Sequence, residues 1–236
     1  MNLPLNPATH PHAPMELARF NMIEQQIRPW NVYDGETLDV LGRVRREEFA
    51  PPAYRSLALM DIEIPLRGNA EEALRKGECM LSPKVEARLL QDLQVTRKDR
   101  VLEIGAGSGF MAALLAQMAD QVVSLEIDAE LAAMAQDNLQ RAGVQNAAVR
   151  VSDGALDQIP DGPFNVILLS GSVASIPESL LSLLRDGGRL AAIVGDEPMM
   201  RATFVRREGD RFITTQPWDT VAARLCNFPE PSAFRF

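Results

Sequence analysis

The sequence predicts a doubly wound α/β fold, with a mostly parallel sheet, an N-terminal helical cap and an antiparallel C-terminal edge. After Arg100, short apolar segments alternate with helical segments, a pattern typical of parallel strands joined by right-handed crossovers. The first of these apolar segments leads directly into three alternating glycines, at the end of the strand where such sheets bind ligands. The spacing of apolar residues is helical before this region and alternates after Arg201, as in a hairpin.

The cap is predicted from helical periodicity interrupted by prolines. We expect helices over residues 15–27 and 35–45 and a third that begins at Pro83, because apolar residues recur three or four positions apart in each. Residues 61–76 lack this period. There we expect a short strand over residues 62–65, followed by an irregular polar stretch.

Five strands and three helices are predicted for the sheet region. We expect strands over residues 101–104, 122–125, 147–151, 164–169 and 189–194. The intervening helices are expected over residues 110–118, 129–142 and 177–184, and a turn at Gly187-Gly188 precedes the fifth strand. Residues 203–206 and 211–215 flank the turn Glu208-Gly209-Asp210, which predicts an antiparallel hairpin.

We expect three parts along the chain. Residues 1–14 are rich in proline and small polar residues, which favours a flexible arm without the features of a signal peptide. Residues 15–98 would form the helical cap and the segment that leads from it to the sheet. Residues 99–236 would form a Rossmann-like core with a β-rich C-terminal edge.

The bulk composition excludes several classes of protein. The formal net charge is −8, which argues against a nucleic-acid partner because phosphate contacts need a basic surface. Only two cysteines, Cys79 and Cys226, and two histidines near the start are present, so we expect no disulfide framework and no metal site. No apolar run approaches the roughly 20 residues of a membrane helix, so we expect no membrane partner and a cytoplasmic location.

The glycine-rich segment after the first strand indicates the ligand. Its pattern is E-x-G-x-G-x-G, formed by Glu103, Gly105, Gly107 and Gly109 with Ala106 and Ser108 between them. We expect the Glu103 carboxylate near the mouth of the loop, where it suits a cationic ligand better than a pyrophosphate. S-adenosylmethionine is such a ligand, since it carries a sulfonium and an α-ammonium group. A glycine turn without a ligand is the alternative.

Two acidic residues follow the next two strands. Glu126 ends the second strand, about 20 residues after the first glycine, where an acidic side chain binds ribose hydroxyls in related folds. Asp153-Gly154 follows the third strand, where a carboxylate can accept from an adenine amino group. Each could instead be an ordinary strand-end acid or turn. Together with the glycines, they favour a nucleoside-containing cofactor.

At this point the chain resembles the protein-L-isoaspartate O-methyltransferase family, a class of S-adenosylmethionine-dependent methyltransferases. The resemblance rests on VLEIGAGSGF (101–110), SLEI (124–127), SDG (152–154) and DGGRL (186–190), and on MIEQQIR (22–28) and RREEFAP (45–51) in the cap. It implies methyl transfer from S-adenosylmethionine to the isoaspartyl carboxylate of a damaged peptide or protein. It implies cofactor binding by Glu103, Gly105, Ala106, Gly107, Ser108, Gly109, Glu126, Ile127, Asp153, Gly154 and Ser170.

The chain departs from the family on the acceptor side. Where the family has Thr-Ile-Ser-x-Pro, this sequence has Cys79-Met80-Leu81-Ser82-Pro83, so the threonine position is Cys79 and the serine position is Leu81. Cys79 and Ser82 are therefore the candidate catalytic residues. Residues 67–78 and the loop that begins at Ser170 also differ from the family.

These departures leave other functions open. The chain could be a related methyltransferase with a small-molecule acceptor or a different carboxylate acceptor. It could also be a regulator that binds S-adenosylmethionine without catalysis. An NAD-dependent dehydrogenase is disfavoured by the glycine spacing and by Glu103.

Overall fold

A computed structural model describes residues 13–159 and 161–230, and it has the predicted fold class. The seven strands of the main sheet lie in the order β5-β4-β3-β6-β7-β8-β9. Strands β3 to β7 pair in parallel, and β8 and β9 add an antiparallel edge. The strand order reverses between the neighbours β3 and β6, which makes their carboxyl ends the expected ligand-binding crevice.

All the strands and helices predicted for the sheet region are present, although the last four strands are longer than expected. The strands are β3 (Arg100–Ile104), β4 (Gln121–Glu126), β5 (Ala147–Val151), β6 (Phe164–Val173), β7 (Leu184–Asp196), β8 (Met199–Glu208) and β9 (Arg211–Asp219). The helices are α6 (Phe110–Met118), α7 (Ala129–Arg141) and α8 (Glu178–Ser182). The turn expected at Gly187-Gly188 is an irregularity inside β7, because pairing with β6 resumes at Arg189.

The cap consists of short helices and one small hairpin. These are α1 (Ala13–Asn21), a π-helical stretch (Met22–Ile27), 3₁₀ turns (Arg28–Trp30 and Pro52–Leu57), α2 (Gly35–Arg43), α3 (Arg46–Phe49), β1 (Ile64–Pro65), α4 (Ala70–Lys76), β2 (Cys79–Met80) and α5 (Pro83–Leu93). Most of the arm expected over residues 1–14 lies outside the described residues, although Ala13 and Pro14 already belong to α1.

The expectation of an irregular stretch after residue 65 is wrong. Asn69 accepts from the backbone N–H groups of Glu71 and Glu72, and Gly77 ends α4 in the left-handed conformation at φ 75°. These are ordinary helix caps, but the helix buries only Ala73, so no apolar period reveals it. After α4 the chain returns as β2, which pairs antiparallel with β1.

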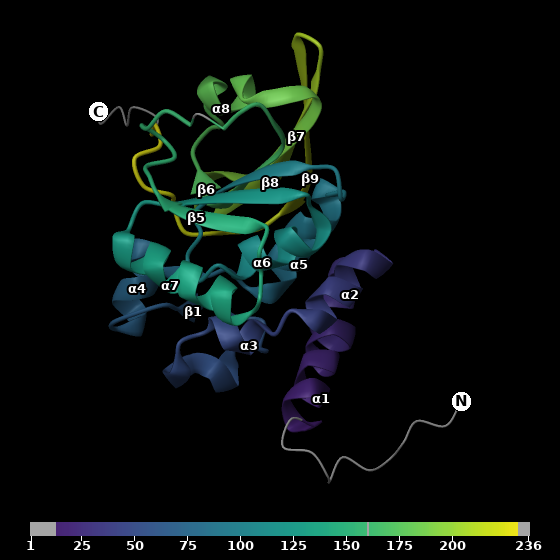
Figure 1. Ribbon diagram of the computed structural model, residues 1–236, viewed down its shortest axis with the longest axis vertical. Helices are drawn as coiled ribbons and strands as arrows, with labels where there is room; N and C mark the ends of the chain where they lie inside the picture. Colours follow the sequence, from purple (N-terminus) through teal and green to yellow (C-terminus); the bar gives the residue numbers. More distant parts are fainter. Residues whose placement is uncertain (1–12, 160, 231–236) are drawn as a thin grey trace.

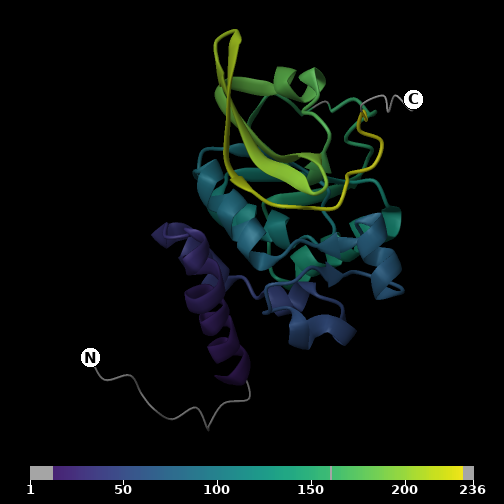
Figure 2. The same cartoon turned by 180° about the vertical axis from the view of Figure 1, so that it is seen from behind.

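The layers of the molecule are visible in Figure 1. Helices α5, α6 and α7 lie on one face of the sheet, and the purple and blue cap segments lie beyond them. Figure 2 shows the yellow segment after β9 running past the sheet to its far side. One hydrophobic cluster joins cap residues such as Ile27 and Leu41 to sheet residues such as Val101, so the cap and the sheet share a core.

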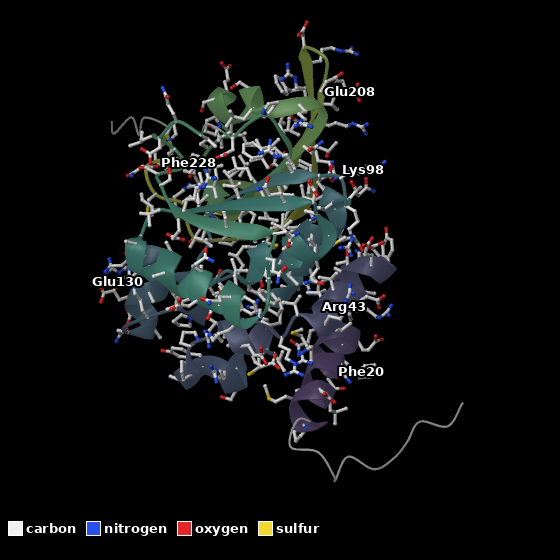
Figure 3. All side chains as sticks on the ribbon, in the orientation of Figure 1. Phe20, Arg43, Lys98, Glu130, Glu208 and Phe228 are labelled. Carbon is white, nitrogen blue, oxygen red and sulfur yellow. The ribbon has the colours of Figure 1, made fainter. Side chains whose placement is uncertain are left out.

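The outer surface of the cap is more exposed. Phe20 projects from α1 and is 57 % exposed (Figure 3), and the expected apolar face of this first helix is therefore only partly buried. Within the described ranges, the helices are too short or too polar for any of them to cross a membrane.

A buried arginine connects the cap to the sheet. Arg46 on α3 donates to the carbonyl of Ala58 (2.9 Å) and the carbonyl of Leu81 (2.6 Å), and it pairs with Glu86 of α5. Its guanidinium also lies 5.0 Å from the ring centre of Phe110, the first residue of α6. Burial raises the pKa of Glu86 to about 7, and the neighbouring Arg46 opposes that rise.

We expect Arg46→Met to lower the free energy of unfolding by about 3–5 kcal/mol, because it leaves the Glu86 carboxyl buried without its partner. Urea denaturation at neutral pH measures this loss. The double variant Arg46→Met/Glu86→Leu removes both charges and should recover part of it. A loss below about 1 kcal/mol in the single variant would contradict a structural role for the pair.

Candidate active site

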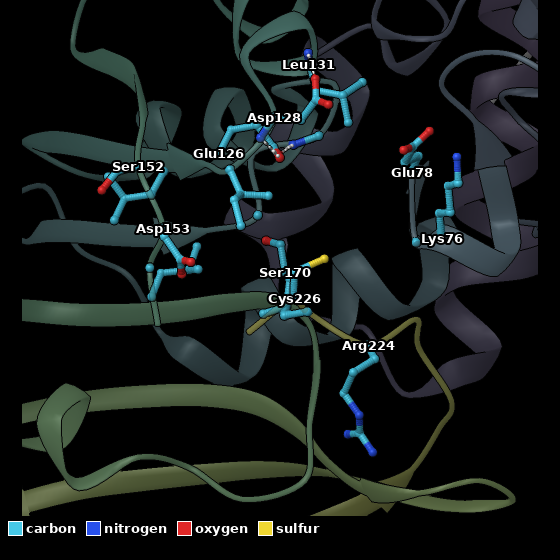
Figure 4. Close-up of a pocket in the computed structure, with 18 of the residues that line it drawn as sticks. Lys76, Glu78, Glu126, Asp128, Leu131, Ser152, Asp153, Ser170, Arg224 and Cys226 are labelled. Carbon is cyan, nitrogen blue, oxygen red and sulfur yellow. Dashed lines mark hydrogen bonds between the residues drawn. The ribbon is translucent and has the colours of Figure 1, made fainter. Parts of the chain in front are cut away.

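A cavity opens at the carboxyl ends of β3, β4, β5 and β6, where the strand order reverses (Figure 4). It has a volume of about 220 Å³ and is partly open to solvent. Seven of the predicted cofactor residues line it: Gly105, Gly107, Glu126, Ile127, Asp153, Gly154 and Ser170.

The other residues of the glycine loop lie beneath the cavity. Ala106, Ser108 and Gly109 do not line it, and Ser108 is 3 % exposed. The Ser108 carbonyl accepts from the Asn138 side chain (2.8 Å). Gly109 has φ 80°, and a Cβ there would lie 3.0 Å from the carbonyl oxygen of Ala135. Ser108 and Gly109 therefore hold the loop against α7.

Four of the five backbone N–H groups of the loop (residues 105–109) are bonded within the protein. Gly105 and Ala106 both donate to the Leu125 carbonyl (2.8 and 3.1 Å), and Gly109 donates to the Ala106 carbonyl (2.7 Å). Gly107 donates to Oε2 of Glu126 (2.8 Å). A pyrophosphate at a glycine loop is bound by such N–H groups, so this loop is unsuited to a dinucleotide.

Glu126 lies at the end of β4, where the hydrogen bond from Gly107 of the glycine loop holds its side chain. It is 7 % exposed, and its Oε1 accepts from the backbone N–H of Asp128 (3.2 Å). Ile127 beside it is 43 % exposed and adds an apolar surface to the cavity. The pair therefore combines a carboxylate with an apolar surface, as the binding of ribose hydroxyls and a flat base requires.

Asp153-Gly154 follows β5 on the same side of the cavity. Oδ1 of Asp153 accepts from the backbone N–H of Ala155 (2.9 Å), and its Oδ2 accepts from the side chain of Asn227 (2.6 Å). A Cβ on Gly154 would lie 2.5 Å from Cγ2 of Ile104 at the end of β3, so a larger residue in this turn would require Ile104 to move.

Glu103 does not lie at the mouth of the loop, contrary to the expectation from sequence. Its side chain is fully buried and accepts from the hydroxyls of Ser124 (2.6 Å) and Ser170 (2.8 Å). Burial raises its pKa to about 7, and the two serine hydrogen bonds oppose this rise. Glu103 therefore contacts the cavity only through Ser170.

Of the two candidate catalytic residues, one lines the cavity and the other does not. Cys79 on β2 lines the cavity, and its carbonyl oxygen lies 3.8 Å from where a Cβ of Gly107 would be. Burial, with smaller contributions from Glu63 and Glu86, raises the pKa of the Cys79 thiol to about 12. Ser82 is the N-cap of α5 and does not line the cavity. Leu81, at the family's serine position, is buried in the core.

Two groups of residues that line the cavity were not among the predicted site residues. Lys76, Gly77 and Glu78 come from the end of α4, and Arg224, Leu225 and Cys226 come from the segment after β9. The latter segment bonds to the end of β6, with the Leu225 N–H donating to the Ser172 carbonyl (2.9 Å). Neither segment carries a recognisable motif, although the caps of α4 could have revealed that helix.

The charges around the cavity fit a cationic nucleoside. Four carboxylates line it, from Glu78, Glu126, Asp128 and Asp153, and two of them, Glu78 and Asp128, are paired with Arg67. The two cations that line it are paired elsewhere: Lys76 with Glu72 (2.6 Å), and Arg224 with Asp196 (2.5 Å) and Glu230 (2.9 Å). The acidic and apolar lining, with bonded loop amides, is suited to S-adenosylmethionine. Among the described residues, no group of His, Cys, Asp and Glu is arranged to hold a metal ion.

Comparison of the sequence with known proteins identifies relatives of this chain. A profile of the protein-L-isoaspartate(D-aspartate) O-methyltransferase family matches residues 18–222. The protein-L-isoaspartate O-methyltransferase of Koribacter versatilis is 34 % identical over 200 residues, which cover 85 % of this chain and 86 % of that protein. The protein of the same name from Methanoculleus marisnigri is 36 % identical over 197 residues, covering 83 % and 86 %.

Solved structures of two other proteins have the same fold as this chain. One protein-L-isoaspartate O-methyltransferase superposes with a TM-score of 0.75 at 22 % identity, covering 89 % of this chain; this chain spans 65 % of that one. A structure from Plasmodium falciparum, described under the same enzyme name and in complex with S-adenosyl-L-homocysteine, has a TM-score of 0.71 at 16 % identity and covers 89 % and 96 %. The chain belongs to the protein-L-isoaspartate(D-aspartate) O-methyltransferase family of S-adenosylmethionine-dependent methyltransferases.

Proposed function

We propose that this chain methylates the carboxylate of isoaspartyl residues in damaged peptides or proteins, with the cavity at the β3–β6 crevice as its active site. The observation that carries this proposal is the combination of Glu126 and Asp153 with a glycine loop in which four of the five amides are bonded to the protein. Bound there, S-adenosylmethionine would supply a methyl group on a cationic sulfur. Family membership supports the acceptor class.

In this proposal Glu126 binds the ribose and Asp153 binds the adenine. Glu126 is held by the Gly107 N–H, which leaves its carboxylate facing the cavity. Asp153 is held by Asn227 and by the backbone after it. Ile127 and Gly154 supply the apolar surface and the room for a base.

The acceptor side needs positioning rather than a general base. A carboxylic acid is already ionised near neutral pH, so the protein has only to align its oxygen and exclude water. We assign this side to β2 and Cys79, since Ser82 lies outside the cavity. With a pKa near 12, the Cys79 thiol stays protonated and does not compete as a nucleophile.

We expect methyl transfer to an isoaspartyl peptide and none to the matched peptide with normal aspartate. The assay measures transfer of a labelled methyl group from S-adenosylmethionine to the two peptides. Cofactor binding, followed separately by calorimetry, is the control for a folded site. Binding without methylation of either peptide would reject the isoaspartyl acceptor and favour another acceptor or a regulatory role.

We expect Glu126→Ala and Asp153→Ala each to raise the Kd for S-adenosylhomocysteine by roughly 10- to 100-fold, because each loses a charged hydrogen-bond acceptor. Isothermal calorimetry measures the affinity. Asp137→Ala, which removes an exposed acid from α7, is the matched control. Unchanged affinity in both site variants would contradict the proposed placement of ribose and adenine.

We expect Glu103→Gln to reduce the pH dependence of stability. The raised pKa of Glu103 means that the native state keeps a proton that the unfolded chain loses near pH 4.5. The stability that Glu103 contributes is therefore present in acid and is lost as the pH rises to about 7. The difference in unfolding free energy between pH 5 and pH 8 should shrink by on the order of 2 kcal/mol, measured by urea denaturation. An unchanged difference would show that Glu103 is ionised in the native protein.

A further inference from the structure

Arg67 lies between the acceptor side of the cavity and the ribose side. It follows β1, at the start of the segment that contains α4 and returns as β2 with Cys79. We propose that Arg67 is a positioning residue for methyl transfer, which holds this α4 segment (residues 64–80) against the loop after β4. The proposal rests on the function proposed above, because it assigns Arg67 no contact of its own with cofactor or acceptor.

The guanidinium of Arg67 bonds to carboxylates on both sides. Its Nε and Nη2 donate to the two oxygens of Glu78 (both 2.9 Å). Its Nη1 and Nη2 donate to the two oxygens of Asp128 (3.0 and 2.6 Å), and Nη1 also reaches Glu130 (2.8 Å). Two paired contacts of this kind fix both the distance and the orientation between the carboxylates.

Two of the three carboxylates bonded to Arg67, those of Glu78 and Asp128, line the cavity. Glu78 comes directly before β2, and its backbone N–H donates to the Ala73 carbonyl (2.8 Å), so its position sets that of Cys79. Asp128 caps α7 by accepting from the backbone N–H groups of Glu130 and Leu131, and its own N–H donates to Glu126. Figure 4 shows Glu78 and Asp128 on different segments beside the cavity.

A continuous set of contacts therefore joins the two halves of the site. It runs from Glu78 through Arg67 to Asp128, and from Asp128 through Glu126 to the glycine loop at Gly107. Glu126, on the cofactor side, and Cys79, on the acceptor side, lie on separate segments. Arg67 is bonded to a residue of each segment, Asp128 and Glu78.

Loss of Arg67 would reverse the electrostatics between these segments. Its hydrogen bonds are the largest cause of the lowered pKa values of Glu78 and Asp128, so both carboxylates are ionised at neutral pH. Without the guanidinium, Glu78 would face Asp128 and Glu130 with no cation between them. Like charges at this distance repel, which would move the α4 segment away from the cofactor.

The fold itself does not depend on this contact. The α4 segment keeps its antiparallel pairing between β1 and β2, and Leu66 is buried in the core. Arg67 is 29 % exposed, so its ion pairs are partly screened and add modestly to stability. We therefore expect the loss of Arg67 to change the distance between the α4 segment and the loop after β4, and hence the geometry of the site.

The test compares Arg67→Ala with Arg189→Ala. Arg189 pairs with Asp99 through a side chain of similar exposure, 23 %, in the part of the sheet near the amino end of β3, away from the cavity. We expect Arg67→Ala to raise the Kd for S-adenosylhomocysteine at least about fivefold and to lower kcat for the isoaspartyl peptide. Arg189→Ala should leave both unchanged while lowering Tm by a similar or larger amount.

Two further variants separate positioning from a general loss of structure. Asp128→Asn keeps a side-chain oxygen for the α7 cap but weakens the ion pair, so its effect and that of Arg67→Ala should not add in the double variant. Arg67→Lys keeps the charge without two paired contacts and should recover affinity only in part.

Three outcomes would overturn the proposal. These are unchanged affinity and kcat in Arg67→Ala, equal losses in Arg189→Ala, and additive effects of Arg67→Ala and Asp128→Asn. Failure of the proposed function is distinguishable from these, because the wild-type chain would then bind S-adenosylhomocysteine without methylating the isoaspartyl peptide, or would not bind it. The binding comparison among variants does not depend on the acceptor.

Discussion

The buried guanidinium of Arg46 fixes the arrangement on which the site depends. It bonds to the loop after α3, to the backbone of Leu81 and to Glu86, and it lies over Phe110 at the start of α6. A buried cation is costly unless its donors are satisfied, so these groups constrain one another. These contacts therefore fix the position of the cap relative to the residues just after β2 and to α6, the helix that follows the glycine loop.

The choice of ligand follows from hydrogen bonds inside the loop. In a dinucleotide site the loop amides are free to bind phosphate, whereas here they donate to Leu125, Ala106 and Glu126. The same bond that occupies the Gly107 amide also orients the Glu126 carboxylate. Glu126 thus occupies one of the loop amides and also gives the cavity an acceptor for hydroxyl groups, in agreement with the cofactor of the family.

The parts of the site that could be predicted are those at the ends of regular strands. Glu126 and Asp153 could be placed because parallel strands end at one edge of the sheet. The orientation of Glu103 could not, because β3 is buried on both faces and either face can hold its side chain. The structure places Glu103 beside Ser124 and Ser170, where two hydroxyls bond to it. The helix α4 was missed because it buries almost no apolar surface.

The sequence by itself determined the fold class, the order of the strands and helices in the sheet region, and the strand ends at which Glu126 and Asp153 lie. Periodicity and glycine spacing are local, and the family motifs are contiguous, so no distant contact was needed to recognise them. Only the tertiary structure decided which residues complete the site. Arg67 meets Asp128 across 61 positions, and Asn227 meets Asp153 across 74. Contacts of this kind depend on how β2 and the segment after β9 pack on the sheet, and no local pattern encodes that packing.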